Sequence, residues 1–134
     1  MLVIKELDGS YRRSLEDYLE AYDTKKTNVN ENKTVSFGYF LEDKLVGGIT
    51  AKIEGFHIMY IESLFVLEEY RMHKIGSSLI KKMEEYAKFE GMLIIRLDTF
   101  SWQAKDFYLK LGYELISSYE IKEGFSEYFF LKRL

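Results

Sequence analysis

The chain has 134 residues, enough for one compact domain and short for two, so we expect a single domain over residues 1–134. Its 47% apolar and 31% charged residues are typical of a globular protein, and a net charge of -3 argues against nucleic-acid binding, which depends on an excess of Lys and Arg. No apolar stretch predicts a membrane helix or a secretory signal, and the lack of cysteine excludes disulfides and a thiol nucleophile, so a cytoplasmic protein is expected.

The first half of the chain predicts a strand, a helix and an antiparallel ribbon. Residues 2–7 favour a strand, and apolar residues at helical spacing predict a helix from Tyr11 to about Lys26. A polar loop is expected at residues 27–33. Three strands then follow, at residues 35–41, 45–54 and 57–66.

The second half predicts alternating helices and strands. A helix from Ile75 ends before Gly91, and the apolar run 92–97 indicates a central strand covered on both faces. A short helix at residues 104–111 and two final strands at 113–118 and 127–131 complete the order β-α-β-β-β-α-β-α-β-β. This order predicts a mixed α/β sheet with one parallel crossover near its centre.

A strand, a loop and a helix start follow one another between residues 62 and 79. The first turn of a helix carries unpaired N–H groups and the positive end of the helix dipole, and both favour a diphosphate. Arg71, His73 and Lys74 add positive charge, and Gly76 allows close approach of the backbone. The segment lacks the glycines of a dinucleotide-binding fingerprint or a P-loop. Taken alone, it is equally well explained as an ordinary helix start with solvated basic residues.

Three sequence blocks resemble the GNAT family of N-acetyltransferases, which use acetyl-coenzyme A (acetyl-CoA). Arg71 and Gly76 match the ends of the family motif Q/R-x-x-G-x-G/A, and the run 61–66 is similar to the preceding strand in polyamine and other small-amine acetyltransferases. Residues 104–113 resemble the family segment A-x-x-F-Y-x-K-x-G-F/Y. The resemblance implies the acyl-CoA N-acyltransferase fold, a mixed α/β fold whose mostly antiparallel sheet contains a parallel pair splayed to admit CoA.

The resemblance also implies which residues bind the cofactor. They are Leu64, Phe65 and Val66 at a bulge in the strand, the loop residues Arg71, Met72, His73, Lys74, Ile75, Gly76 and Ser77, and Ser101, Ala104 and Phe107 further along the chain.

Two of these residues depart from the family pattern. Lys74 replaces the central glycine; if that glycine is needed for a positive φ, lysine costs about 1–2 kcal/mol. If it is needed only for close approach, Lys74 can point outward and offer its ammonium to a phosphate, which is the alternative we favour. Ser101 stands where the family often has an asparagine facing the pantetheine arm, and its hydroxyl can still hydrogen-bond an amide.

The resemblance implies two catalytic residues. Tyr108 matches a tyrosine proposed as the general acid that protonates the departing thiolate; a phenol, with an ordinary pKa of about 10, keeps its proton at neutral pH. Glu62 matches a strand glutamate proposed as general base, and strand alternation predicts that it shares a face with Tyr60, Leu64 and Val66. A core tyrosine and an exposed strand carboxylate are the structural alternatives.

The remaining candidate residues carry weaker signals. His57 and His73 are the only histidines and have no cysteine companions, so no metal site is expected. Trp102 lies beside the expected site, where it can contact cofactor or substrate or close the edge of the core.

We therefore expect an acetyl-CoA-dependent N-acetyltransferase that moves the acetyl group directly to the primary amine of a small molecule or peptide, without nucleic-acid or membrane partners. The alternatives are a non-catalytic acyl-CoA-binding or sensing domain, which the lysine at position 74 favours, and an interaction module with the same topology. Residues 128–131 form an aromatic strand that could pair with a second copy at a sheet edge, so a homodimer is left open.

Overall fold

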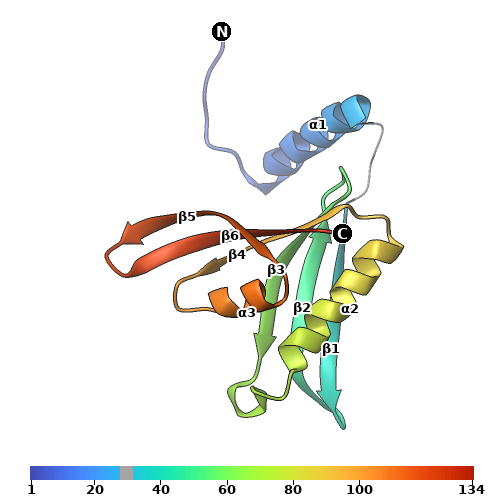
Figure 1. Ribbon diagram of the computed structural model, residues 1–134. Coiled ribbons are helices and arrows are strands. Elements are labelled where there is room, and N and C mark those ends of the chain that lie inside the picture. The colour runs from blue at the N-terminus through green and yellow to red at the C-terminus, as the bar shows by residue number, and fades with distance from the viewer. Residues whose placement is uncertain (28–31) are drawn as a thin grey trace. The chain divides into compact units, whose positions relative to one another are not determined.

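The computed structural model describes residues 1–27 and 32–134, and the chain divides at residue 31 into two compact units, each described by itself. In the first unit, helix α1 spans Gly9–Thr27 (Figure 1), which confirms the predicted helix. Asp8 begins it, because its Oδ1 accepts hydrogen bonds from the N–H groups of Ser10 at 3.0 Å and Tyr11 at 3.1 Å. Bonds from the Ser10 hydroxyl and these N–H groups lower the Asp8 pKa.

The predicted strand at residues 2–7 is wrong, because the segment has no strand partner. Leu2, Val3 and Ile4 are exposed. Strand propensity reflects how well a side chain packs on a paired, half-buried sheet. Without a neighbouring strand, the propensity of these residues does not produce a strand. The loop predicted at 27–33 lies largely outside the described residues. Within residues 1–27 and 32–134, no helix is both long and apolar enough to cross a bilayer.

The second unit is built on a six-stranded sheet with the order β1-β2-β3-β4-β6-β5. The strands are β1 (Lys33–Leu41), β2 (Lys44–Ile53), β3 (Ile58–Val66), β4 (Ile94–Phe100), β5 (Glu114–Lys122) and β6 (Phe125–Arg133). All pairs are antiparallel except β3 with β4, which confirms the expected mixed sheet. The aromatic strand β6 lies between β4 and β5, so the expectation that it offers a free edge is wrong; β5 is the edge strand on that side.

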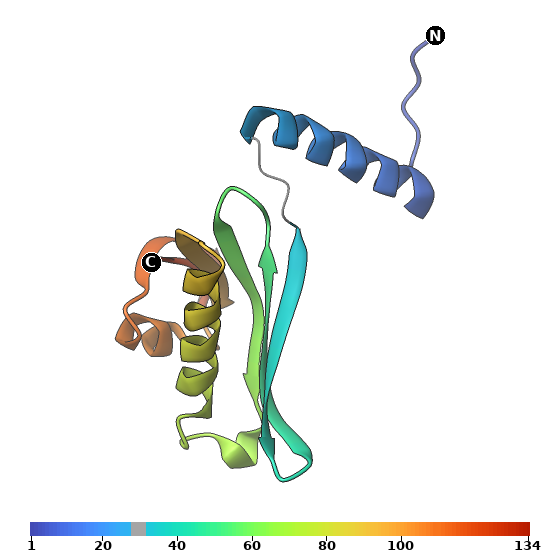
Figure 2. The ribbon, with the colours of Figure 1, turned by 90° about the vertical axis from the view of Figure 1, so that its right-hand side faces the viewer.

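Helix α2 (Ile75–Phe89) lies along one face of β1, β2 and β3 (Figure 2). The short helices η1 (Glu68–Tyr70) and α3 (Lys105–Lys110) flank it in sequence. The core lies between helices and sheet, and its largest fully buried side chains are Val46, Ile49, Ile53, Met59, Ile80, Met83, Ile95 and Phe130. Gly91, at φ +78°, follows α2 as the predicted helix terminator.

A half-buried polar network ties α2 to the C-terminal half of the sheet. The Glu84 carboxylate accepts hydrogen bonds from the Tyr113 hydroxyl at 2.9 Å and from Lys132 Nζ at 3.0 Å. Lys132 Nζ also donates to the Leu111 carbonyl at 2.9 Å. Burial, together with the Glu84 charge, raises the pKa of Tyr113, so this phenol stays a donor. The network links α2 to β6 and to the turn after α3.

Lys74, the residue before α2, adopts a left-handed conformation with φ 61° and ψ 21°. The alternative favoured from the sequence, that the family glycine serves only close approach, is therefore wrong for this backbone. Met72 is also left-handed, at φ 71°. Both residues carry the strain of a Cβ placed near the following carbonyl.

Replacing Lys74 with glycine should therefore stabilise the fold. We expect Lys74→Gly to raise the free energy of unfolding by about 1 kcal/mol, because relief of left-handed strain exceeds the extra entropy of the unfolded glycine. Urea denaturation measures this change. Lys81→Gly, at an exposed position inside α2, is the control and should lower stability by a similar amount. Equal destabilisation by both changes would contradict strain at Lys74.

Candidate active site

The two central strands separate after a short stretch of pairing. Only Ile58–Tyr60 of β3 pairs with Ile94–Arg96 of β4. Beyond these pairs the two strands run apart in Figure 1, while β4 stays paired with β6 along its whole length. We call residues 61–66 of β3 and 97–100 of β4 the split.

The split leaves a few backbone groups without a partner strand. Leu67 N donates to Val46 O of β2 at 2.9 Å, so by alternation Val66 and Leu64 direct their backbone groups away from β2, toward the split. Ser101 N donates to Ser126 O of β6 at 2.8 Å, and by the same alternation Asp98 directs its backbone groups toward the split. Unpaired groups of this kind need a partner, and a bound amide can supply one.

Side chains cap the outer ends of both splayed strands. Arg71 Nε donates to the Val66 carbonyl at 2.9 Å, and the Arg71 guanidinium lies over the Phe65 ring at 5.2 Å. On the other strand, Gln103 Oε1 accepts from Phe100 N at 2.8 Å and from the buried Thr99 hydroxyl at 2.9 Å. The free groups of the split are thus confined to its middle. The sequence analysis assigned Arg71 to the cofactor and gave Gln103 no role.

The loop after β3 leads into α2, which begins without a side-chain cap. No side chain caps α2, and Ser78 N donates to the Lys74 carbonyl at 3.0 Å. The preceding N–H groups of residues 74–77 are therefore available to an anion. Met72, His73 and Lys74 are exposed around this turn, whereas Ile75 is buried in the core.

Gly76 serves packing within the protein. A Cβ added at Gly76 would lie 3.3 Å from the Phe107 ring of α3, closer than ordinary contacts. Phe107, predicted as a cofactor residue, thus packs on the first turn of α2, and Ala104 packs beside it on the core. Both residues position the loop and α3 around the split.

Glu62 lies at a β-bulge. Thr50 of β2 pairs with Ser63 and Ala51 pairs with Ile61, which leaves Glu62 as the extra residue of β3. The bulge was expected at residues 64–66 and lies earlier. Glu62 Oε1 forms an ion pair with Lys52 Nζ at 3.1 Å.

The bulge also overturns the expected alternation. Leu64 and Val66 pack on the core, facing α2. Glu62 instead pairs with Lys52, which lies between the buried residues Ala51 and Ile53 and so points to the opposite face. One extra residue shifts every later side chain to the other face, so Leu64 and Val66 turn to the core. Glu62 keeps the alternation with the buried Ile61 and lies on the face opposite α2.

Tyr108 lies on the helical side of the sheet and is 8% exposed. Its ring packs against Phe107, Tyr113 and Phe130 at centroid distances of 5.1 to 5.8 Å. Burial raises its pKa to about 12. Among the described residues, the Tyr108 hydroxyl has no hydrogen-bond partner. Every polar side-chain atom that is fully buried there does have a partner, so the Tyr108 hydroxyl must be accessible to solvent. The structure thus places Tyr108 and Glu62 on opposite faces of the sheet.

Ser101 does not present a free hydroxyl. Its Oγ accepts from Ser126 N at 3.1 Å and lies 3.4 Å from the Gly124 carbonyl, which fastens the loop after β4 to the β5–β6 hairpin. The predicted bond to a pantetheine amide would compete with this anchor.

Two residues that the sequence analysis did not identify bridge the narrow end of the split. The Tyr60 hydroxyl donates to Asp98 Oδ2 at 3.0 Å, one step beyond the last backbone pair. Arg96 lies over the Tyr60 ring at 4.4 Å and binds Glu54 at 2.6 Å. Burial, with the Asp98 bond, raises the pKa of Tyr60. The signal in the sequence was weak, since only alternation in two separate strands brings these residues together.

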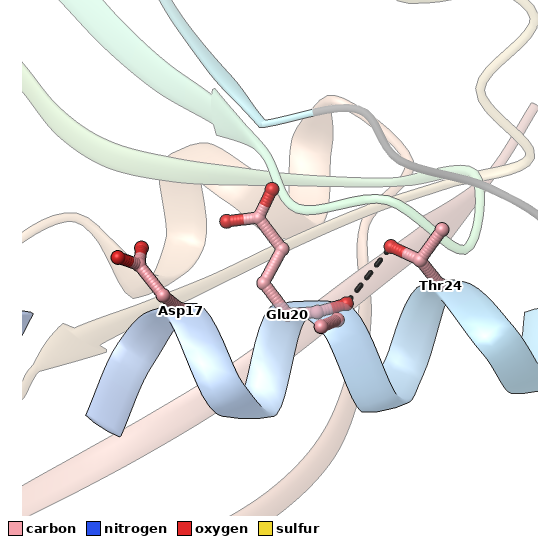
Figure 3. A pocket seen from close by; sticks show the side chains of 4 residues that line it. Asp17, Glu20 and Thr24 are labelled. Atoms are coloured by element: carbon pink, nitrogen blue, oxygen red, sulfur yellow. Dashed lines mark hydrogen bonds between the residues drawn. The ribbon is translucent and has the colours of Figure 1, made fainter. Parts of the chain in front are cut away.

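A separate hollow lies along α1, lined by Asp17, Glu20, Ala21 and Thr24 (Figure 3). Within it the Thr24 hydroxyl donates to the Glu20 carbonyl at 2.8 Å, and the lining contains none of the predicted site residues. In the part of the chain that the structure describes, no three His, Asp or Glu side chains gather as metal ligands.

Known proteins share this architecture. An acetyltransferase crystal structure from Bacillus cereus ATCC 14579 superposes with a TM-score of 0.88 at 30% identity, covering 99% of this chain and 98% of that one. The PaiA N-acetyltransferase of Thermoplasma acidophilum, solved with coenzyme A, gives a TM-score of 0.65 at 22% identity over 96% of this chain and 80% of that one.

Sequence comparison agrees. Thialysine N-epsilon-acetyltransferase of Bos taurus is 41% identical over 56 residues, which make up 40% of this chain and 33% of that protein. A second curated relative is matched over 55% of its length, so the chain spans about half the length of these relatives or less. The family model of the acetyltransferase (GNAT) family matches residues 2–113. The split sheet, the uncapped start of α2 and these matches together show that the chain belongs to the acetyltransferase (GNAT) family.

Proposed function

We propose that this chain transfers the acetyl group of acetyl-CoA directly to the primary amine of a small molecule or peptide. The observation that carries the proposal is the parting of β3 from β4 beside the uncapped start of α2. The proposal assigns the activity to one domain of residues 1–134, supported by a family match that runs from residue 2 to 113.

The two features fit the two ends of the cosubstrate. A pantetheine arm carries amides that can take up the unpaired groups of Leu64, Val66 and Asp98, in the manner of an added strand. The diphosphate suits the N–H groups of residues 74–77, where the helix dipole favours negative charge. Lys74 holds the left-handed turn that a glycine would hold, so the reason to prefer a non-catalytic binding domain is weakened.

In the proposed reaction one proton is donated on one face of the sheet and one is accepted on the other. The amine nitrogen attacks the thioester carbonyl carbon, and a backbone N–H of the split stabilises the resulting oxyanion. The C–S bond then breaks, and the new C–N bond is retained in the product. The thiolate takes the Tyr108 hydroxyl proton, which solvent restores, and Glu62 accepts the amine proton directly or through water. Burial, which raises the Tyr108 pKa, would also raise the pKa of a thiol beside it, and a raised thiol pKa favours protonation of the departing thiolate.

The nature of the acceptor is part of the proposal. By its name, thialysine N-epsilon-acetyltransferase acts on a side-chain amine of an amino acid. A carboxylate at Glu62, on the face opposite the helices, suits an amine that approaches from that side.

Release of free CoA thiol from acetyl-CoA, measured with a panel of primary amines, tests the function. We expect amine-dependent release by the native chain. Tyr108→Phe should lower kcat roughly 10²–10⁴-fold, the range for a positioned acid, while binding of CoA persists. Because burial raises the pKa of Tyr108 to about 12, deprotonation of its hydroxyl should cause no loss of activity between pH 7 and pH 10.

Tyr39→Phe, on an exposed tyrosine of β1, is the matched control and should keep the native kcat. Binding of acetyl-CoA without turnover of any amine would favour the acyl-CoA-binding alternative. Native kcat in Tyr108→Phe would make this tyrosine a packing residue.

Glu62→Gln tests the base. We expect its defect in kcat/KM to shrink as pH rises, because more of the free amine is then already deprotonated. The pH profile with one competent amine measures this. Lys52→Met removes the partner of Glu62 without removing the base, and it should leave the pH dependence close to native. A defect of constant size from neutral to alkaline pH, shared by both variants, would assign Glu62 to the ion pair alone.

A further inference from the structure

An aromatic cluster lies where β4 ends and β6 begins. The Trp102 indole stacks on Phe100 at 4.8 Å and 2°, and on Phe125 at 4.5 Å and 21°. The two phenylalanine rings are 6.1 Å apart, which is less than the two stacking layers that would separate rings on opposite faces of the indole. Both therefore lie under the same face of Trp102. The other face is open, and Trp102 is 60% exposed.

Hydrogen bonds hold this platform in place. Gln103 Oε1 binds Phe100 N, and Ser101 exchanges backbone and side-chain bonds with Ser126 of the hairpin. The indole thus sits on a loop fixed at both sides, so little conformational entropy is lost when a ligand covers it.

The platform shares a face with two carboxylates. Asp98 and Phe100 alternate along β4 with the buried residues Leu97 and Thr99, so both point away from the core. Glu127 of β6 pairs with Phe100. This is the face to which Glu62 also points, as its ion pair with Lys52 shows.

Unlike Glu62, Asp98 and Glu127 form no ion pair within residues 1–27 and 32–134. Asp98 accepts from the Tyr60 hydroxyl and Glu127 accepts from the Tyr119 hydroxyl, and both donors are neutral phenols. The nearby Arg96 binds Glu54, and Lys122 lies over the Phe125 ring at 5.8 Å. One ring of the cluster thus already attracts a cation, and neither of these two basic side chains forms an ion pair with Asp98 or Glu127.

We propose that Trp102 is a specificity-determining residue that binds a second cationic nitrogen of the acceptor by a cation–π contact, with Glu127 supplying the opposite charge. The proposal rests on the acetyltransferase function proposed above. The acceptor class is a small molecule with a reacting primary amine and another protonated nitrogen. Asp98 and Phe100 are two residues apart, so the platform begins about 7 Å along β4 from Asp98, at the outer end of the split. A neutral acceptor of the same length would cover the indole and leave both carboxylates unpaired.

Cadaverine and pentylamine form a matched pair of probes, because they differ only in the second ammonium group. With the full chain and saturating acetyl-CoA, we expect kcat/KM for cadaverine to exceed that for pentylamine roughly 5- to 30-fold, the range of a partly desolvated cation–π contact. Trp102→Leu should abolish this preference and leave KM for acetyl-CoA unchanged, whereas Trp102→Phe should keep part of it. Phe89→Leu, at an exposed aromatic residue of α2, should keep all of it. Equal kcat/KM values for the two amines, or a preference that survives Trp102→Leu, would overturn the proposal.

Fluorescence gives a readout that does not depend on turnover, because Trp102 is the only tryptophan of the chain. Cadaverine should shift or quench the emission at concentrations where pentylamine does not. An emission unchanged by millimolar cadaverine would overturn the proposal even if amines are acetylated. A cadaverine-specific change without thiol release from acetyl-CoA would instead support the cation site and contradict the proposed acetyl transfer.

Discussion

The parting of β3 from β4 after three backbone pairs is the constraint on which the rest of the structure depends. A sheet interrupted at its centre loses ladder hydrogen bonds, and other contacts must hold its halves together. The Tyr60–Asp98 bond does so on one face. On the other, the Glu84–Lys132 pair joins α2 to β6, and Phe107 packs on the first turn of α2. The split can stay open because its two sides are anchored elsewhere.

The same constraint separates the chemical roles in space. Caps from Arg71 and Gln103 close the outer ends of the split and confine its free backbone groups to the middle. In the proposed function a buried tyrosine works from the helical face, and Glu62 at the bulge offers a carboxylate on the other face. The proton donor and the proton acceptor are then kept apart by the sheet, so both can work on one thioester without neutralising each other.

The sequence predicted the elements of the second unit and the family, because periodicity and local motifs are properties of single segments. What failed depends on partners distant in the chain. The bulge at Glu62 exists only in register with β2, and residues 2–7 have strand propensity without a strand to pair with. Ser101 stands at a family position that faces the pantetheine arm, yet its hydroxyl binds a hairpin 23 to 25 residues away. Lys74 was misjudged because the identity of a residue does not reveal its φ angle.

Backbone amide exchange tests the central claim, that the split is held open for a pantetheine arm, most directly. By NMR, the amides of Leu64, Val66 and Asp98 should exchange fast in the free protein, while Phe65, which pairs with Gly48, exchanges slowly. Saturating CoA should slow exchange at the three split amides and leave Phe65 unchanged. Slow exchange at the split amides without ligand, or fast exchange that saturating CoA does not alter, would contradict the account.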